Sequence, residues 1–181
     1  MNKLEKLNKK IKDCKKCPLW KSRKNTVPGE GPIYAKIIII GQAPGAEEDK
    51  TGRPFVGRAG NFLNRLLKIA GIKREKVFIT SPIKCFPPKN RKPTKEEIKT
   101  CLPYLEQQME VINPRKIILL GGVAFSLFFP KEKLNNFRGK IIKKDGKVYF
   151  PTYHPAAGLR FPNIRRILEK DSKKIKDSKF F

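Results

Sequence analysis

The fold is decided at residues 37–45, which read IIIIGQAPG. An aliphatic run that ends in glycine is typical of a buried parallel strand feeding a turn that faces a ligand. Residues 117–121, which read IILLG, repeat the pattern. The two stretches therefore predict two central strands of one sheet. Both are far shorter than the roughly 20 apolar residues that a membrane-spanning helix needs.

Helical signals separate these two strands. Residues 59–70 carry apolar side chains at the spacing of one helix face, and Gly71 follows as a common residue just past a helix end. Residues 77–80 predict a third strand. The next helix begins after Thr94, because Glu97 completes a capping box with it.

The alternation continues toward the C-terminus. The helix after Thr94 is expected to run to about Val111. The remaining expected elements are a short helix at 123–129, a strand at 148–153 and a basic helix at 162–176. Strands separated by helices predict an α/β fold, with three α/β/α layers around a mostly parallel sheet. In such sheets, ligands bind beyond the carboxyl ends of the strands.

Length and composition fit one compact domain over residues 1–181, since 39% of the residues are hydrophobic and no repeat or boundary is evident. We expect a basic tail, at about residues 172–181, to fray. The lysine-rich segment 1–16 lacks the apolar stretch and cleavage site of a secretion signal. We therefore expect a cytoplasmic monomer with no membrane partner.

The chain is strongly basic. It carries 42 Lys and Arg against 16 Asp and Glu, for a formal net charge of +26. Such a chain can bind a polyanion with release of counterions, which makes nucleic acid the first partner to consider. The alternative is a composition set by genome bias or by heat, since both can favour lysine. Charge alone leaves both interpretations open.

The four cysteines form two pairs. Cys14 and Cys17 have C-x2-C spacing, and Cys85 and Cys101 form a wider second pair. The cytosol keeps thiols reduced, so a metal site is a better interpretation than two disulfides. A zinc ribbon usually supplies two C-x2-C pairs, but spacing alone does not separate zinc from a [4Fe–4S] cluster. Four unrelated buried cysteines are the remaining alternative.

Four motifs join the cysteines in a recognisable order. They are G-x-A-P-G at 41–45, P-F-V-G-x-A-G at 54–60, I-T-x-x-x-K-C-x-P-P-x-N-R at 79–91 and Y-H-P-A-x-x-L-R at 153–160. Over about residues 14–160 the chain resembles the family 4 (type IV, thermostable, iron–sulfur) uracil-DNA glycosylases. The resemblance implies a four-stranded parallel sheet between helices and a [4Fe–4S] cluster on the four cysteines, with zinc as the other candidate. It also implies base-excision repair, in which hydrolysis of the N-glycosidic bond removes uracil from DNA and leaves an abasic site.

This chemistry asks for a donor at the departing base and a positioned water, because C–N cleavage makes the sugar positive and the uracil ring negative. His154 is the only histidine and matches the H-P motif of the family, where the imidazole helps to stabilise the uracil anion. Gln42 stands where the family usually carries Glu. An amide can orient water but cannot take its proton, so we expect a slower reaction.

The resemblance also implies how the base is held. A glycosylase extrudes its target nucleotide, stacks the base and hydrogen-bonds the base edge. Phe55 corresponds to the stacking aromatic of the family, and Ser81 stands where the family normally has an Asn that makes paired bonds to uracil. Loss of that Asn should relax discrimination by roughly 1–3 kcal/mol. The expected substrate-binding set is Gly41, Gln42 and Ala43 through their turn, with Phe55, Ser81, Asn90 and His154.

Basic residues in the motif loops are expected to bind phosphates beside the flipped nucleotide. The candidates for DNA contact are Arg58, Lys84, Arg91 and Arg160. The final Phe180-Phe181 is similar to tails that dock on sliding clamps through paired aromatics, although the usual upstream residues are missing.

The departures at Gln42 and Ser81 keep two other functions open. One is a glycosylase of the same fold that removes hypoxanthine or xanthine, and the other is a non-catalytic relative that binds uracil-containing or single-stranded DNA. A metal-dependent nuclease is disfavoured, because the acids at 47–49 have no second acid cluster to complete a metal site.

Overall fold

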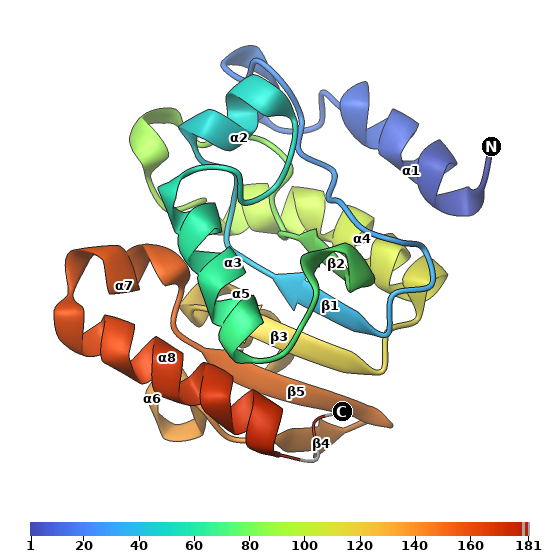
Figure 1. Cartoon of the computed structure of the whole chain (residues 1–181). Helices are drawn as coiled ribbons and strands as arrows, with labels where there is room; N and C mark the ends of the chain where they lie inside the picture. The colour runs from blue at the N-terminus through green and yellow to red at the C-terminus, as the bar shows by residue number, and fades with distance from the viewer. Residues whose placement is uncertain (179, 181) are drawn as a thin grey trace.

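The computed structural model describes residues 1–178 and residue 180. One sheet crosses the molecule in the strand order β2-β1-β3-β5-β4 (Figure 1). Its strands are β1 (Ile37–Ile40), β2 (Val77–Thr80), β3 (Lys116–Leu120), β4 (Ile142–Lys144) and β5 (Lys147–Thr152). The first four in the spatial order are parallel, and β4 pairs antiparallel with β5. The α/β fold and the mostly parallel sheet are confirmed.

The expected four-stranded sheet has a fifth strand because of a hairpin. Asp145 and Gly146 both have positive φ, 51° and 72°, and form a two-residue turn between β4 and β5. Asp-Gly between two extended segments is a strong local signal for such a turn. The sequence therefore carries a local signal for β4.

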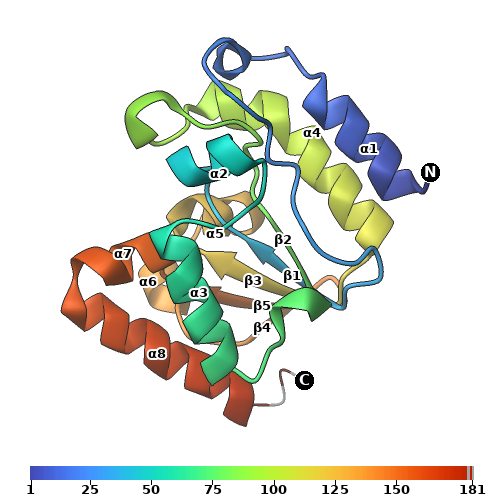
Figure 2. The ribbon, with the colours of Figure 1, turned by 45° about the horizontal axis from the view of Figure 1, so that its top comes forward.

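Helices cover both faces of the sheet, as Figure 2 shows. Ile37 and Ile39 face a core shared with α3 (Arg58–Ile69) and α8 (Pro162–Asp177). Ile38 and Ile40 face the opposite core. That second core is shared with α1 (Lys3–Lys12), α4 (Lys95–Ile112) and α5 (Gly122–Phe128). Because successive strand residues point to opposite faces, a run of four isoleucines fits only a strand buried on both sides.

Most expected helices are confirmed, including the capping box between Thr94 and Glu97 at the start of α4. We did not predict α1, although Leu4, Leu7 and Ile11 lie on one buried helix face. Three short helices were also missed, namely α2 (Ala46–Thr51), α6 (Leu134–Phe137) and α7 (Pro155–Arg160). Single turns at η1 (Pro18–Lys21), η2 (Arg74–Lys76) and η3 (Pro88–Asn90) are of the 3-10 type. Elements this short carry too few residues for a periodic signal.

The expected frayed tail is wrong for the described residues. Helix α8 continues to Asp177, and Ile175 belongs to the core under the sheet. Phe180 is fully buried, with its ring centroid 5.9 Å from that of Phe150. Apolar burial therefore holds this end of the chain in place. Phe181 lies outside the described residues, so the clamp contact stays a prediction. The monomeric state also stays a prediction.

The parallel strands bring the sequence motifs to one edge. Residues Gly41, Ser81 and Tyr153 follow β1, β2 and β5 directly. Gly121 follows β3 at a positive φ of 89°, and a Cβ there would lie 3.1 Å from the Cβ of His154. A larger residue at 121 would thus press on His154, which lies two residues beyond the end of β5. No helix in the described part of the chain is long and apolar enough to cross a membrane.

Candidate active site

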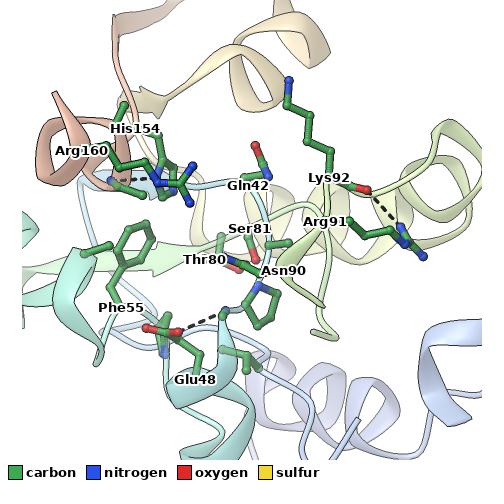
Figure 3. Close-up of a pocket in the computed structure, with 18 of the residues that line it drawn as sticks. Gln42, Glu48, Phe55, Thr80, Ser81, Asn90, Arg91, Lys92, His154 and Arg160 are labelled. Carbon is green, nitrogen blue, oxygen red and sulfur yellow. Dashed lines mark hydrogen bonds between the residues drawn. The ribbon is translucent and has the colours of Figure 1, made fainter. Parts of the chain in front are cut away.

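A cavity of about 390 Å³ opens at this edge (Figure 3). It is lined by six of the seven expected substrate-binding residues, namely Gln42, Ala43, Phe55, Ser81, Asn90 and His154. Arg91 and Arg160 also line it. Gly41 lies directly behind, since a Cβ on it would approach both the Phe55 ring and His154. The fold therefore brings together residues that are more than 100 positions apart in the sequence.

His154 is held as a neutral hydrogen-bond donor. It precedes α7, and its Nδ1 accepts a hydrogen bond from the Ala156 amide at 3.2 Å (Figure 3). Burial lowers the pKa of His154 to about 4, and the nearby charge of Glu48 opposes that shift only in part. A neutral ring whose Nδ1 accepts must carry its proton on Nε2. Nε2 lies only 3.8 Å from the position of a Cβ on Gly41, so this N–H faces the end of β1.

Phe55 lies beside this histidine. Its ring stacks with the imidazole at a centroid distance of 5.6 Å and an interplanar angle of 29°. The backbone of Phe55 has a positive φ of 52°, which is strained for a residue with a large side chain. A Cβ on Gly41 would lie 2.8 Å from the ring, and one on Gly60 would overlap the Phe55 carbonyl. Both glycines are needed for this placement of the ring.

Glu48 holds the Phe55 loop against the turn after β1. Its Oε1 accepts hydrogen bonds from the amides of Val56 at 2.9 Å and Gly57 at 3.0 Å. Its Oε2 accepts from the amide of Gly45 at 3.1 Å. Glu48 also lines the cavity, where we had noted only an acid cluster. Its neighbour Asp49 is buried and accepts from the amide of Lys24, so that acid is structural.

Thr80 and Ser81 line the cavity, and their hydroxyl groups form hydrogen bonds within the protein. Ser81 Oγ donates to the Ile83 carbonyl at 2.6 Å. Thr80 Oγ1 donates to the Pro28 carbonyl or to Gln108, and accepts from Lys84 at 2.6 Å. Both hydroxyl protons are therefore used within the protein.

Lys84 was expected to contact DNA, and this prediction is wrong. The side chain is 1% exposed, and its ammonium donates to Thr80 Oγ1, the Ser81 carbonyl and Gln108 Oε1 at 2.6–2.7 Å. Burial lowers the pKa of Lys84 to about 7, while three oxygen acceptors favour the charged form. A lysine in a basic loop looks like a surface residue in sequence, and only the three partners reveal its place in the core.

The loop that carries Asn90 closes one side of the cavity. Lys89 and Asn90 both have positive φ, and Asn90 lies exposed at the rim. Arg91 forms a two-bonded ion pair with Glu97, at 2.9 and 2.7 Å, which ties this loop to α4. Its guanidinium is thus engaged within the protein, although its side chain remains 42% exposed.

Two other expected DNA contacts have the exposure that the role requires. Arg160 is exposed and lines the cavity, and Arg58 is exposed at the first residue of α3. Leu159 and Phe161 beside Arg160 are also exposed, at 39% and 55%. This apolar pair was not predicted, because an exposed aromatic cannot be told from a buried one in a short segment.

The turn after β1 offers fewer backbone donors than expected. The Gly41 amide donates to the Thr80 carbonyl at 2.9 Å, so it is not available to a substrate. The amides of Gln42 and Ala43 have no acceptor among the described residues. A base in the cavity can therefore use the second and third residues of this turn, but not the first.

The four cysteines line a second, smaller cavity. Cys14 and Cys17 come from the segment after α1, while Cys85 and Cys101 come from the loop after β2 and from α4. All four are free thiols. Within residues 1–178 and 180, no three His, Cys, Asp or Glu side chains stand at the spacing for one metal ion.

The surroundings of these cysteines suit thiolates held by a positive group. Burial raises the pKa of the Cys101 thiol to about 11, which disfavours an isolated thiolate. Arg23 Nη1 donates to Cys85 Sγ at 3.2 Å, and Lys84 lines the same cavity. Trp20 and Tyr104 line the same cavity, in which Cys85 and Cys101 are buried and Cys14 and Cys17 are partly exposed. The chemistry of this set, four thiols with cationic side chains beside them, suits thiolate ligands, although the sulfur atoms do not converge on the position of a single metal ion.

Comparison with known proteins identifies relatives over nearly the whole chain. A model of the uracil DNA glycosylase superfamily matches residues 28–175. A type-4 uracil-DNA glycosylase of Sulfurisphaera tokodaii is 46% identical, over 98% of this chain and 85% of the relative. Proteins of the same name from Saccharolobus solfataricus and Thermotoga maritima are 47% and 45% identical. These two matches cover 98% and 96% of this chain, and 87% and 93% of the relatives.

Proposed function

The chain belongs to the uracil-DNA glycosylase superfamily, and we propose that the cavity at the carboxyl edge of its sheet is the site that binds the flipped base. The protein is a DNA-repair glycosylase that removes uracil from DNA by hydrolysis of the N-glycosidic bond. The roles of its individual residues follow from the geometry of the cavity.

The observation that carries this assignment is the fixed tautomer of His154. As the C–N bond breaks, negative charge collects on the carbonyl oxygens of uracil. A neutral imidazole with its Nε2–H turned to the end of β1 can donate to such an oxygen without giving up its proton. A donor oriented before the reaction costs no reorganisation in the transition state. His154 is therefore the electrophilic residue of the proposed mechanism.

Phe55 supplies the stacking surface for the base. Its ring is placed by Gly41 and Gly60 and by the hydrogen bonds from the next two residues to Glu48. A ring fixed in this way can receive a flipped base without ordering a loop at the moment of binding. The free amides of Gln42 and Ala43 and the side chain of Asn90 are the proposed polar contacts.

Gln42 takes the water-positioning role in this proposal. Its amide can hold a water by one donor and one acceptor, but it cannot remove a proton. An oxocarbenium-like sugar reacts with neutral water, so orientation is sufficient for turnover. Glu48 is the carboxylate that lines the cavity, and its negative charge stabilises the positive charge that develops on the sugar.

The four cysteines are proposed to hold a [4Fe–4S] cluster, in keeping with the resemblance to iron–sulfur glycosylases. Four thiols in one apolar cavity, with Arg23 donating to one sulfur, match the ligand set of such a cluster. When bound, the cluster would tie the segment after α1 to α4 and to the loop after β2. Its role is structural, since the base cavity has a separate lining.

DNA is proposed to approach across the rim formed by Arg160 and Arg58. Arg160 lines the cavity and can contact a phosphate beside the flipped nucleotide. The exposed Leu159 and Phe161 flank it and can fill the space that the flipped base leaves in the stack. Arg91, engaged with Glu97, acts instead by holding the Asn90 loop.

One observation favours wider base specificity as a second candidate function. Ser81 commits its only proton to the Ile83 carbonyl, so it cannot make the paired bonds to uracil expected of Asn. Hypoxanthine or xanthine is thus a candidate second substrate.

The test is excision from oligonucleotides that carry one central uracil, followed by alkali and sizing of the strands. We expect cleavage at uracil by the native chain and at least a hundredfold slower cleavage by His154→Ala, as for the loss of one transition-state donor. Tight binding of the oligonucleotide with no abasic product would contradict the enzymatic assignment and favour a binding protein.

A further inference from the structure

A buried carboxylate on α8 holds the segment that leads into His154. Asp171 is 1% exposed, and neither Asp171 nor its partner Arg138 lines the base cavity. We propose that Asp171 is a positioning residue for the reaction, because it fixes the direction in which the His154 imidazole donates. The inference rests on the proposed role of His154 and adds a residue that acts through it from outside the cavity.

The first contact joins Asp171 to the end of β5. Oδ2 of Asp171 accepts a hydrogen bond from Thr152 Oγ1 at 2.8 Å. The carbonyl of Thr152 accepts from the amide of Gly121 at 2.9 Å. Thr152 is the last residue of β5 and stands two residues before His154. Its side chain is therefore held from α8, and its backbone is held from the residue after β3.

The second contact reaches Tyr153 through Arg138. Nη1 of Arg138 donates to both oxygens of Asp171, at 2.7 and 2.8 Å. The guanidinium carbon lies over the Tyr153 ring, 5.6 Å from its centroid, where a cation is attracted to the aromatic face. The Tyr153 hydroxyl donates to Asn135 Oδ1 at 3.1 Å. The residue directly before His154 is thus held at its ring and at its hydroxyl.

The backbone beside Arg138 is shaped around the same carboxylate. Gly139 has a positive φ of 68°, and a Cβ on it would lie 2.5 Å from Asp171 Oδ1. A residue without a side chain is needed for this close approach. The amide of Gly139 donates to the Pro151 carbonyl at 2.8 Å. Residues 151–153 are therefore all connected to the network around Asp171.

This network is better suited to fixing a geometry than to adding stability. Removing two charges from water offsets most of the attraction between them, so a buried ion pair adds little to the free energy of unfolding. Charged hydrogen bonds, however, have preferred directions and lengths, and several of them together favour one arrangement. The arrangement selected here is that of the end of β5, and the backbone of His154 continues from it.

His154 is then held from both sides along the chain. The residues after it fix the tautomer, through the bond from the Ala156 amide to Nδ1. The residues before it fix the position of the ring. A shift of about 1 Å in a catalytic group can slow a reaction about a hundredfold. Loss of the Asp171 carboxylate should therefore slow cleavage of the C–N bond, while the residues that line the cavity still bind DNA.

The test measures single-turnover excision from a single-stranded oligonucleotide with one central uracil. Asp171→Asn is nearly isosteric but loses the charge that holds Arg138, and Thr152→Val loses the bond from β5. We expect each change to slow cleavage roughly tenfold or more, and to alter the dissociation constant of the oligonucleotide by no more than about twofold. Glu169→Gln is the matched control on α8, because Glu169 pairs with Arg65 of α3 at 3.1 Å. It should leave the rate unchanged.

A cycle with His154→Ala separates positioning from general damage. If Asp171 acts through His154, Asp171→Asn should slow the native chain but cause no further loss in His154→Ala. Nitrogen-15 spectra of the single histidine should show a shifted Nε2 resonance in Asp171→Asn and Thr152→Val, but not in Glu169→Gln. Equal slowing in both backgrounds, or an unshifted resonance in folded Asp171→Asn, would overturn the inference. Absence of excision by the native chain would instead overturn the proposed function, and the spectra would still decide whether Asp171 positions His154.

Discussion

Removal of the Glu48 carboxylate should loosen the base cavity. The carboxylate accepts three backbone hydrogen bonds, from Val56, Gly57 and Gly45, at 2.9–3.1 Å. These bonds join the Phe55 loop to the start of α2. In Glu48→Ala all three amides lose their charged partner.

The expected loss of stability follows from the number of hydrogen bonds that Glu48 accepts. A hydrogen bond to a charged group contributes about 1.5–3 kcal/mol net. Glu48 is half-buried, so water can rebind part of what is lost, and we take about 1 kcal/mol for each bond. The free energy of unfolding should fall by about 3 kcal/mol. For a domain of 181 residues this corresponds to a melting temperature lower by roughly 6–12 °C.

Glu47→Ala is the matched control on the same helix turn. Glu47 pairs with Lys50 at 2.7 Å, but both side chains are more than half exposed. Such a surface pair contributes less than about 0.5 kcal/mol, so the melting temperature should change by no more than about 2 °C. Circular dichroism during heating gives both values. Excision of uracil at a temperature where both variants are folded should be slower only for Glu48→Ala.

Equal melting temperatures for the two variants would refute the reasoning. That result would mean that the loop after Phe55 is held by other contacts and that the three amides are satisfied equally well by water. A loss of stability with unchanged excision would refute the link from Glu48 to the placement of Phe55.

Three further predictions concern other parts of the molecule. Because burial lowers the pKa of His154 from 6.5 to about 4, the folded state binds this proton less readily than the unfolded state. The stability from the neutral ring is present above pH 6.5 and is lost as the pH falls toward 4, which denaturant titrations of the native chain and His154→Gln at several pH values should resolve. Gly41→Ala places a Cβ 2.8 Å from the Phe55 ring, so it should weaken binding of free uracil at least fivefold by calorimetry, whereas Gly146→Ala, where a Cβ meets nothing within 4 Å, should not. Cys101→Ser should lower the iron content of the purified protein and its melting temperature together, and unchanged iron would contradict the four-cysteine site.

The central layers of the fold could be predicted because their sequence signals are redundant. The run at Ile37–Ile40 is aliphatic at every position, and it is followed by glycine. Helix α4 was located by the Thr94 and Glu97 capping box as well as by its apolar spacing. The β4 hairpin and α1 also have sequence signals, namely Asp145-Gly146 and the apolar spacing of residues 4–11. Both signals are short and lie in lysine-rich segments. The helix at 162–176 was predicted to within one residue of the end of α8, but burial of Phe180 beyond it was not, because basic composition hides the apolar residues there.

Some residues of the candidate site could be located from the sequence, and others could not. Residues in recognisable motifs, such as Phe55 and His154, lie where expected. Lys84 was misread because its role depends on Gln108, a partner distant in the sequence. The role of Glu48 was missed because its partners are backbone amides, which no residue type marks. The sequence around a charged loop residue does not show whether its side chain is buried. The direction of the Ser81 proton likewise depends on the backbone of Ile83, which no pattern of residue types specifies.

The central claim is that a neutral His154 donates from Nε2 to the departing uracil. The chain has one histidine, so nitrogen-15 labelling of histidine gives a single imidazole in the magnetic resonance spectrum. We predict that between pH 6 and 8 this ring shows a protonated Nε2 and a bare Nδ1, and that bound uracil shifts the Nε2 proton downfield. A doubly protonated ring, or a proton on Nδ1, would contradict the proposed mechanism at its first step.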